Sequence, residues 1–123
     1  AGSEGRVAFG YVGDTGNQTW KGYMTILTDA FSDNPLFTTV QVNLPEDPLD
    51  SSNAYPEGCG YERCGGLGDF LDMAVDQYGR PWFSLANNDA GEIGIFATIN
   101  AGPTLRGDLQ ELTLMPLGGV STL

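Results

Sequence analysis

Apolar and polar residues alternate along several short stretches of the chain, and this period of two is typical of half-buried β-strands. In the first part of the chain, β-branched and aromatic residues are enriched in three such stretches. Turn-forming residues at 13–17 and 32–35 separate them. The predicted strands are 6–12, 20–27 and 36–42. Because they follow one another with short connections, we expect an antiparallel meander.

A second group of strands follows a long connection. Residues 45–68 contain three prolines, five glycines and both cysteines without any periodicity, so they are predicted to form a loop. Beyond this loop, turns at 77–80 and 87–91 and the pair Gly102-Pro103 punctuate the pattern. The predicted strands are 70–76, 81–86, 92–99 and 109–115.

The grouping of these strands predicts an all-β fold of antiparallel four-stranded meanders. Such groups, recurring about every 40 to 50 residues, are typical of β-propeller blades, and two to three blades are expected. We place one blade at about residues 6–44, the loop at 45–68, a second blade at 69–116 and a tail at 117–123. Because a closed propeller needs about four blades or more, a small β-sandwich is the alternative that suits the short chain.

The composition is strongly acidic and excludes several functions. Sixteen acidic residues against five basic ones give a formal charge of −11, so a nucleic acid would be repelled. Histidine is absent, which removes the commonest general base and metal ligand and excludes hydrolytic triads and zinc sites. No apolar run reaches the roughly 18 residues of a transmembrane helix, and no leader opens the chain, so we expect a mature, soluble segment or a fragment of one.

The two cysteines, Cys59 and Cys64, are separated by four residues in a glycine-rich loop. This spacing favours a disulfide. Half of a metal site is the alternative, but no other cysteine and no histidine is present to complete one. The small ring would hold the loop rather than stabilise the whole domain. A disulfide indicates an oxidising compartment, so we expect the chain to be extracellular or at a cell surface.

Several segments match one known pattern in the same order along the chain. They are Trp20-Lys21-Gly22-Tyr23-Met24, Pro35-Leu36-Phe37-Thr38, the paired-cysteine loop, Asp69-Phe70-Leu71-Asp72 with Val75-Asp76 and Gly79-Arg80-Pro81, and Ala97-Thr98-Ile99. Together they resemble the secreted bacterial and archaeal sialidase-like (BNR-type) β-propeller domains, over about residues 6–107. The resemblance implies that the chain is the C-terminal part of such a propeller.

The catalytic residues of that family do not carry over to this chain. The family's sialidases combine an arginine triad, a Tyr-Glu nucleophile pair and an acidic proton donor. Here the four arginines are Arg6, Arg63, Arg80 and Arg106, and residues 14–20 form only a degenerate version of the family's Asp-box. No catalytic residue is therefore assigned.

Four residues are candidates for binding a glycan: Trp20, Tyr23, Asp72 and Trp82. The aromatic rings, together with that of Tyr11, offer apolar faces on which a sugar ring stacks, and packing inside a blade is their alternative role. Asp69 and Asp72 are three residues apart in a predicted strand, so their side chains point to opposite faces. Asp72 is the better single candidate.

A turn rich in oxygen ligands lies between two predicted strands. Asn87, Asn88, Asp89 and Glu92 are residue types that coordinate Ca²⁺, but their spacing matches no EF-hand loop, and turns favour the same residues. A turn is the favoured interpretation and Ca²⁺ the alternative. No metal site and no other cofactor is predicted.

These features predict an extracellular, non-catalytic propeller segment that contributes to glycan or protein binding or to a cell-surface assembly. One alternative is part of an exo-sialidase or other glycoside hydrolase whose catalytic residues lie on other blades. Another is an independent β-sandwich that serves as a structural subunit of a filament or complex. Because strands 92–99 and 109–115 carry few charges, their exposed edges would aggregate. We expect other blades or another polypeptide to cover them.

Overall fold

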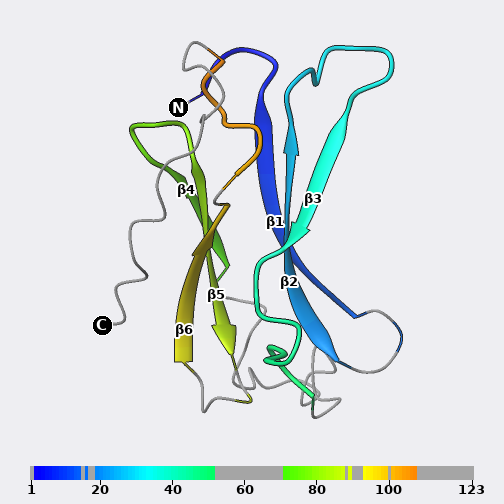
Figure 1. Cartoon of the computed structure of the whole chain (residues 1–123), viewed down its shortest axis with the longest axis vertical. Helices are drawn as coiled ribbons and strands as arrows, with labels where there is room; N and C mark the ends of the chain where they lie inside the picture. The colour runs from blue at the N-terminus through cyan, green and yellow to red at the C-terminus, as the bar shows by residue number, and fades with distance from the viewer. Residues whose placement is uncertain are drawn as a thin grey trace, which may run out of the picture.

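The computed structural model describes residues 2–14, 16, 19–51, 71–87, 89, 93–99 and 101–107. Within these ranges the chain forms six strands and no helix. The strands are β1 (Val7–Asp14), β2 (Trp20–Leu27), β3 (Phe37–Gln41), β4 (Asp72–Val75), β5 (Pro81–Asn87) and β6 (Ile93–Thr98). They make two three-stranded antiparallel sheets, in the orders β1-β2-β3 and β4-β5-β6, which stand side by side in Figure 1.

The all-β prediction is confirmed, and so are six of the seven predicted strands, to within two residues at each end. The four-stranded meanders are not seen, because each sheet has three strands in the described ranges. After β3 the chain leaves the first sheet in a turn, where the Asn43 amide donates to the carbonyls of Leu44 and Asp47 at 3.1 and 2.8 Å. The seventh predicted strand, 109–115, lies outside the described residues.

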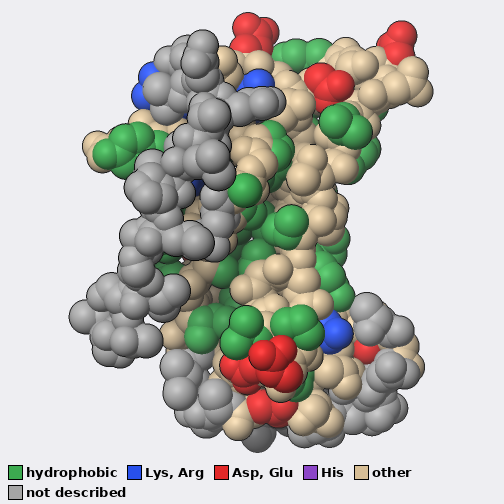
Figure 2. Space-filling model, viewed as in Figure 1, with side chains coloured by type: hydrophobic (Ala, Val, Ile, Leu, Met, Phe, Trp, Pro, Cys, Tyr) green, Lys and Arg blue, Asp and Glu red, His purple; other side chains and the backbone are tan. Residues whose placement is uncertain are grey.

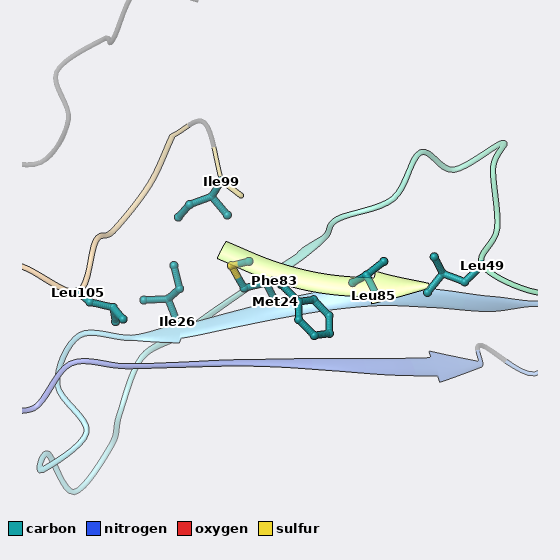
Figure 3. Packing of buried hydrophobic residues seen from close by; sticks show 7 residues of the cluster. All are labelled: Met24, Ile26, Leu49, Phe83, Leu85, Ile99 and Leu105. Carbon is teal, nitrogen blue, oxygen red and sulfur yellow. The ribbon is translucent and has the colours of Figure 1, made fainter. Parts of the chain in front are cut away.

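The two sheets pack face to face around one core. Alternate residues of β2 and β5 point inward, led by Met24, Ile26, Phe83 and Leu85. Leu49, Ile99 and Leu105 complete the cluster from the segments that flank the strands, and Figure 3 shows the seven side chains along β2 and β5. Most of the apolar surface that the fold removes from water lies here, and its burial is the main stabilising contribution.

Two glycines allow the sheets to approach. A Cβ on Gly10 of β1 would lie 2.6 Å from the Phe83 ring, closer than any real contact. A Cβ on Gly22 of β2 would lie 3.2 Å from a methyl group of Leu85. Glycine usually weakens a strand interior. At these positions it provides the space that the two largest inward side chains of β5 occupy.

Backbone hydrogen bonds fasten the two sheets together at both ends. At one end, residues 49–50 pair with β2 through Trp20 N–H to Asp50 C=O at 2.9 Å and Leu49 N–H to Trp20 C=O at 2.8 Å, and Leu49 C=O accepts the N–H of Asp89, which follows β5, at 3.5 Å. At the other end, Ser3 N–H donates to Leu105 C=O at 2.6 Å, and Leu105 N–H donates to Gly79 C=O at 2.7 Å. The N-terminal segment is thereby joined to the second sheet.

Candidate binding face on the second sheet

The structure separates the four candidate glycan-binding residues. Trp20 points inward and packs against the core, whereas Tyr23, three residues further along β2, lies on the outer face of the first sheet. Tyr23 stacks on Tyr11 there, with 5.4 Å between the ring centroids. Asp72 and Trp82 lie together on the outer face of the second sheet. Because side chains alternate along a strand, residues 20 and 23 cannot share a face.

Strand register defines the face around Trp82. Asp72, Ser84 and Phe96 form one row across the sheet, and Ala74, Trp82 and Thr98 form the next. We call these six residues the Trp82 face. The residue paired with Trp82 on β4 is Ala74, which has a small side chain. Phe96 is 76% exposed, so an apolar surface extends across the sheet from the indole toward solvent.

Asp76 holds the indole ring of Trp82 in place. Trp82 Nε1 donates to Asp76 Oδ2 at 3.2 Å, and Arg80 Nε donates to the same oxygen at 2.7 Å. The other carboxylate oxygen accepts the backbone N–H groups of Tyr78 and Arg80, both at 2.9 Å. The Asp76 carboxylate thus binds the backbone of the β4–β5 turn, the guanidinium of Arg80 and the indole of Trp82. These bonds restrict the rotamers of Trp82.

The charge of Asp76 follows from these contacts. Partial burial raises the pKa of its carboxyl group, but hydrogen bonds from the Arg80 backbone, the Arg80 side chain, Trp82 and Tyr78 together outweigh it and leave the pKa below the usual 3.8. Asp76 is therefore ionised at neutral pH, the state in which it accepts all four hydrogen bonds. The guanidinium of Arg80 also lies 5.3 Å from the centroid of the Tyr78 ring.

Residues 101–107 pack against the β4–β5 turn, which begins at Asp76. Gly79 has a φ of +79°, which a glycine adopts without strain, and a Cβ there would lie 2.8 Å from the Arg106 backbone nitrogen. Arg106 Nη1 donates to the Gln77 carbonyl at 3.3 Å. The segment 101–107 therefore packs against the turn and contributes to the position of Asp76.

Polar groups lie beside the indole ring. Asp72 is exposed, and its Oδ1 accepts the Met73 N–H at 2.8 Å. The Ser84 hydroxyl donates to the Asp72 carbonyl at 3.4 Å. Strand register thus places a carboxylate and a hydroxyl in the row next to Trp82.

No family model, curated protein or solved structure matches the chain. The likeness to sialidase-like propellers therefore rests on the sequence segments that carry it. In the described ranges, no helix is long and apolar enough to cross a membrane.

Several residues that the sequence analysis singled out do not belong to the Trp82 face. Cys59, Cys64, Asp69, Asn88 and Glu92 lie outside the described residues. Asn87 is buried and its amide donates to Asp47 Oδ1 at 3.2 Å, while Asp89 Oδ1 accepts the Ser51 N–H at 3.0 Å. Both side chains thus connect β5 and the turn that follows it to the segment after β3. No group of acidic residues able to hold a metal ion occurs in the part of the chain that the structure describes.

Sequence reasoning missed Asp76, Ser84 and Phe96. Asp76 was assigned to the end of a strand, although an aspartate that precedes a glycine-containing turn commonly accepts the backbone N–H groups that follow it. That signal was present in Asp76-Gln77-Tyr78-Gly79. Ser84 and Phe96 belong to the site only because strand register places them beside Asp72 and Trp82.

Proposed function

We propose that this chain is an extracellular, non-catalytic β-sheet module that binds a neutral glycan at the Trp82 face. The observation that carries the proposal is the indole ring of Trp82, held by Asp76 on an outer sheet face beside Asp72 and Ser84. The ring offers an apolar surface for the C–H face of a sugar. The Asp72 carboxylate and the Ser84 hydroxyl are suited to hydrogen-bond the sugar hydroxyl groups.

Charge and geometry narrow the class of glycan. With a net charge of −11, the chain repels anionic saccharides such as sialic acids or uronates, so a neutral hexose chain is the better ligand. Because the Trp82 ring is already fixed, binding costs little side-chain entropy. One aromatic platform with two polar partners gives a weak site, with a dissociation constant of roughly 0.1–1 mM.

The proposed architecture of the module is two neighbouring blades of a sialidase-like propeller. The two sheets are consecutive in sequence, antiparallel and packed face to face, as adjacent blades are, and the ordered sequence segments support the same interpretation. A small β-sandwich shares this packing. In a sandwich the Trp82 face is an outer surface of the molecule, whereas in a closed propeller the next blade would pack against it, so glycan binding at this face requires an arrangement in which the second sheet is uncovered.

Affinity electrophoresis in gels that contain a soluble glucan, mannan or galactan tests the glycan proposal. We expect at least one neutral polysaccharide to retard the chain, and Trp82→Ala to weaken that retardation about tenfold because the stacking surface is lost. Tyr23→Ala, on the outer face of the other sheet, is the matched control and should bind like the wild type. Retardation that survives Trp82→Ala, or that no neutral polysaccharide produces, would contradict the proposal.

The extracellular assignment predicts that Cys59 and Cys64 are joined in a disulfide. Labelling of the native protein with a thiol reagent, without reductant, should modify neither cysteine, whereas labelling after reduction should modify both. Full labelling of both cysteines before reduction would argue against the disulfide and against the oxidising compartment.

A further inference from the structure

We propose that the outer face of the first sheet is an interface with a second copy of this chain. The face consists of three rows across β1, β2 and β3, and we call it the Phe9 face. Its rows are Val7, Leu27 and Phe37; Phe9, Thr25 and Thr39; Tyr11, Tyr23 and Gln41. The proposal does not depend on glycan binding, because this face and the Trp82 face lie on different sheets.

The Phe9 face is apolar and exposed. Val7, Phe9, Tyr11 and Phe37 are 46%, 42%, 38% and 58% exposed, and none of its nine residues is charged. A sheet that faces water normally alternates apolar residues inward with polar residues outward. The first sheet instead carries aliphatic and aromatic side chains on both faces, as a sheet that is covered on both sides does.

The side chains at the centre of the Phe9 face are already largely shielded from water. Thr25 and Leu27 lie on the central strand of this face and are only 2% and 9% exposed. The hydroxyl groups of Thr25 and Thr39 hydrogen-bond to each other at 2.7 Å. Removing these hydroxyls from water therefore costs little, since each already has a partner.

An aromatic stack gives the face its anchor. Phe9 and Tyr11 stack with ring centroids 5.9 Å apart, and Tyr11 and Tyr23 with centroids 5.4 Å apart. The interplanar angles are 28° and 23°. Tightly packed aromatic clusters near the centre of an interface supply most of its binding energy. Because the rings face one another, their planes are less available to a sugar than that of Trp82, and a protein surface is the better occupant.

Charge at the two ends of the face favours a second copy and sets its orientation. Lys21, the only lysine, continues the outward face of β2 beyond Tyr23 at the end nearest the β1–β2 hairpin. Asp29 and Asp33 lie at the opposite end, in the β2–β3 connection, where Figure 2 shows acidic side chains. A twofold axis perpendicular to the strands would place each Lys21 near the acidic connection of the other copy. The Phe9 rings of the two copies then meet near the axis, and the row of Tyr11 and Tyr23 in each copy lies against the row of Val7 and Leu27 in the other, so the interface is self-complementary.

The size of the face predicts a weak dimer. Three strands about 4.8 Å apart, each contributing five residues, give a flat area of about 14 by 17 Å. This is below the roughly 800 Å² per partner of a stable complex, so we expect a reversible dimer with a dissociation constant of about 10–100 μM. The charge of −11 on each copy opposes association, and added salt screens it.

Sedimentation velocity of the whole chain between about 5 and 500 μM, in 0.02 M and 0.5 M NaCl, tests the proposal. We expect a concentration-dependent dimer that is tighter at the higher salt. Phe9→Ser should raise the dissociation constant at least about tenfold. Phe96→Ser replaces an exposed phenylalanine on the other sheet and is the matched control, for which we expect no change.

A charge exchange tests the orientation. In 0.02 M NaCl, Lys21→Glu should weaken the dimer severalfold, and the double variant Lys21→Glu with Asp33→Lys should recover most of the loss. Circular dichroism of each variant checks that the sheets are retained. A wild-type chain that stays monomeric at 500 μM overturns the proposal and leaves the face to a different polypeptide. Association that Phe9→Ser leaves unchanged, or that Phe96→Ser abolishes, overturns it as well.

Discussion

Phe83→Ala is expected to lower the free energy of unfolding by about 3–5 kcal/mol. Phe83 is 1% exposed and lies in the core cluster between the sheets, with its ring in the space that Gly10 leaves. Its removal takes away the buried apolar surface and leaves a cavity. The backbones of β1 and β5 are each hydrogen-bonded within their own sheets, so they are poorly placed to close it. A domain of this size has a total stability of about 5–15 kcal/mol, so this substitution removes a large part of it.

Urea denaturation followed by intrinsic fluorescence measures the loss. Phe96→Ala provides a matched control, because it makes the same change one strand away on a side chain that is 76% exposed. We expect that control to change the stability by less than about 0.5 kcal/mol. Equal losses for the two variants would show that the sheets do not share the core described above.

Asp76→Asn is expected to lower the free energy of unfolding by about 1.5–3 kcal/mol at pH 7. An asparagine is neutral, so it loses the charge-assisted bond from Arg80 Nε and weakens the bond from Trp82 Nε1. How this stabilisation changes with pH follows from the lowered pKa of Asp76. The carboxylate contributes its stabilisation above the unfolded value near 3.8, and the contribution is lost as the pH falls through the lower folded pKa.

The stability difference between wild type and Asp76→Asn should therefore be full at pH 7 and shrink below about pH 3.8, as the wild-type carboxyl group takes up a proton. Chemical denaturation at a series of pH values measures it. Asp33→Asn, in the exposed β2–β3 connection, is the control and should change the stability by less than about 0.5 kcal/mol. A difference that is constant with pH would mean that the ionised state of Asp76 does not stabilise the fold.

The two outer faces of the molecule have different chemistry. The Trp82 face combines a single anchored indole with a carboxylate and a hydroxyl, which suits a small hydroxylated ligand. The Phe9 face combines stacked rings with two threonines that satisfy each other, which suits another protein surface. The proposed glycan site and the proposed dimer therefore leave each other accessible, and variants of one face should not affect the other.

The chain's own pattern of residues was sufficient to predict the all-β class and the positions of the six observed strands. Their side chains alternate with a period of two, and turn-forming residues such as Asp76 to Gly79 mark the breaks, so the information is local. The resemblance to propellers, the disulfide and the seventh strand stay predictions. The four-stranded meanders are not seen, because each sheet has three strands in the described ranges, and after β3 the chain leaves the first sheet in a turn that Asn43 holds through two hydrogen bonds.

Only the tertiary structure decided which candidate residues share a surface. The opposite faces of Trp20 and Tyr23 follow from the alternation of side chains along β2 alone, but Asp72 and Trp82, ten residues apart in sequence, share a face because their two strands pair in one register. Strand register controls this, and register depends on how the sheets pack against each other. The same packing explains Gly10 and Gly22, which weaken strands in isolation but make room for Phe83 and Leu85 once two sheets meet.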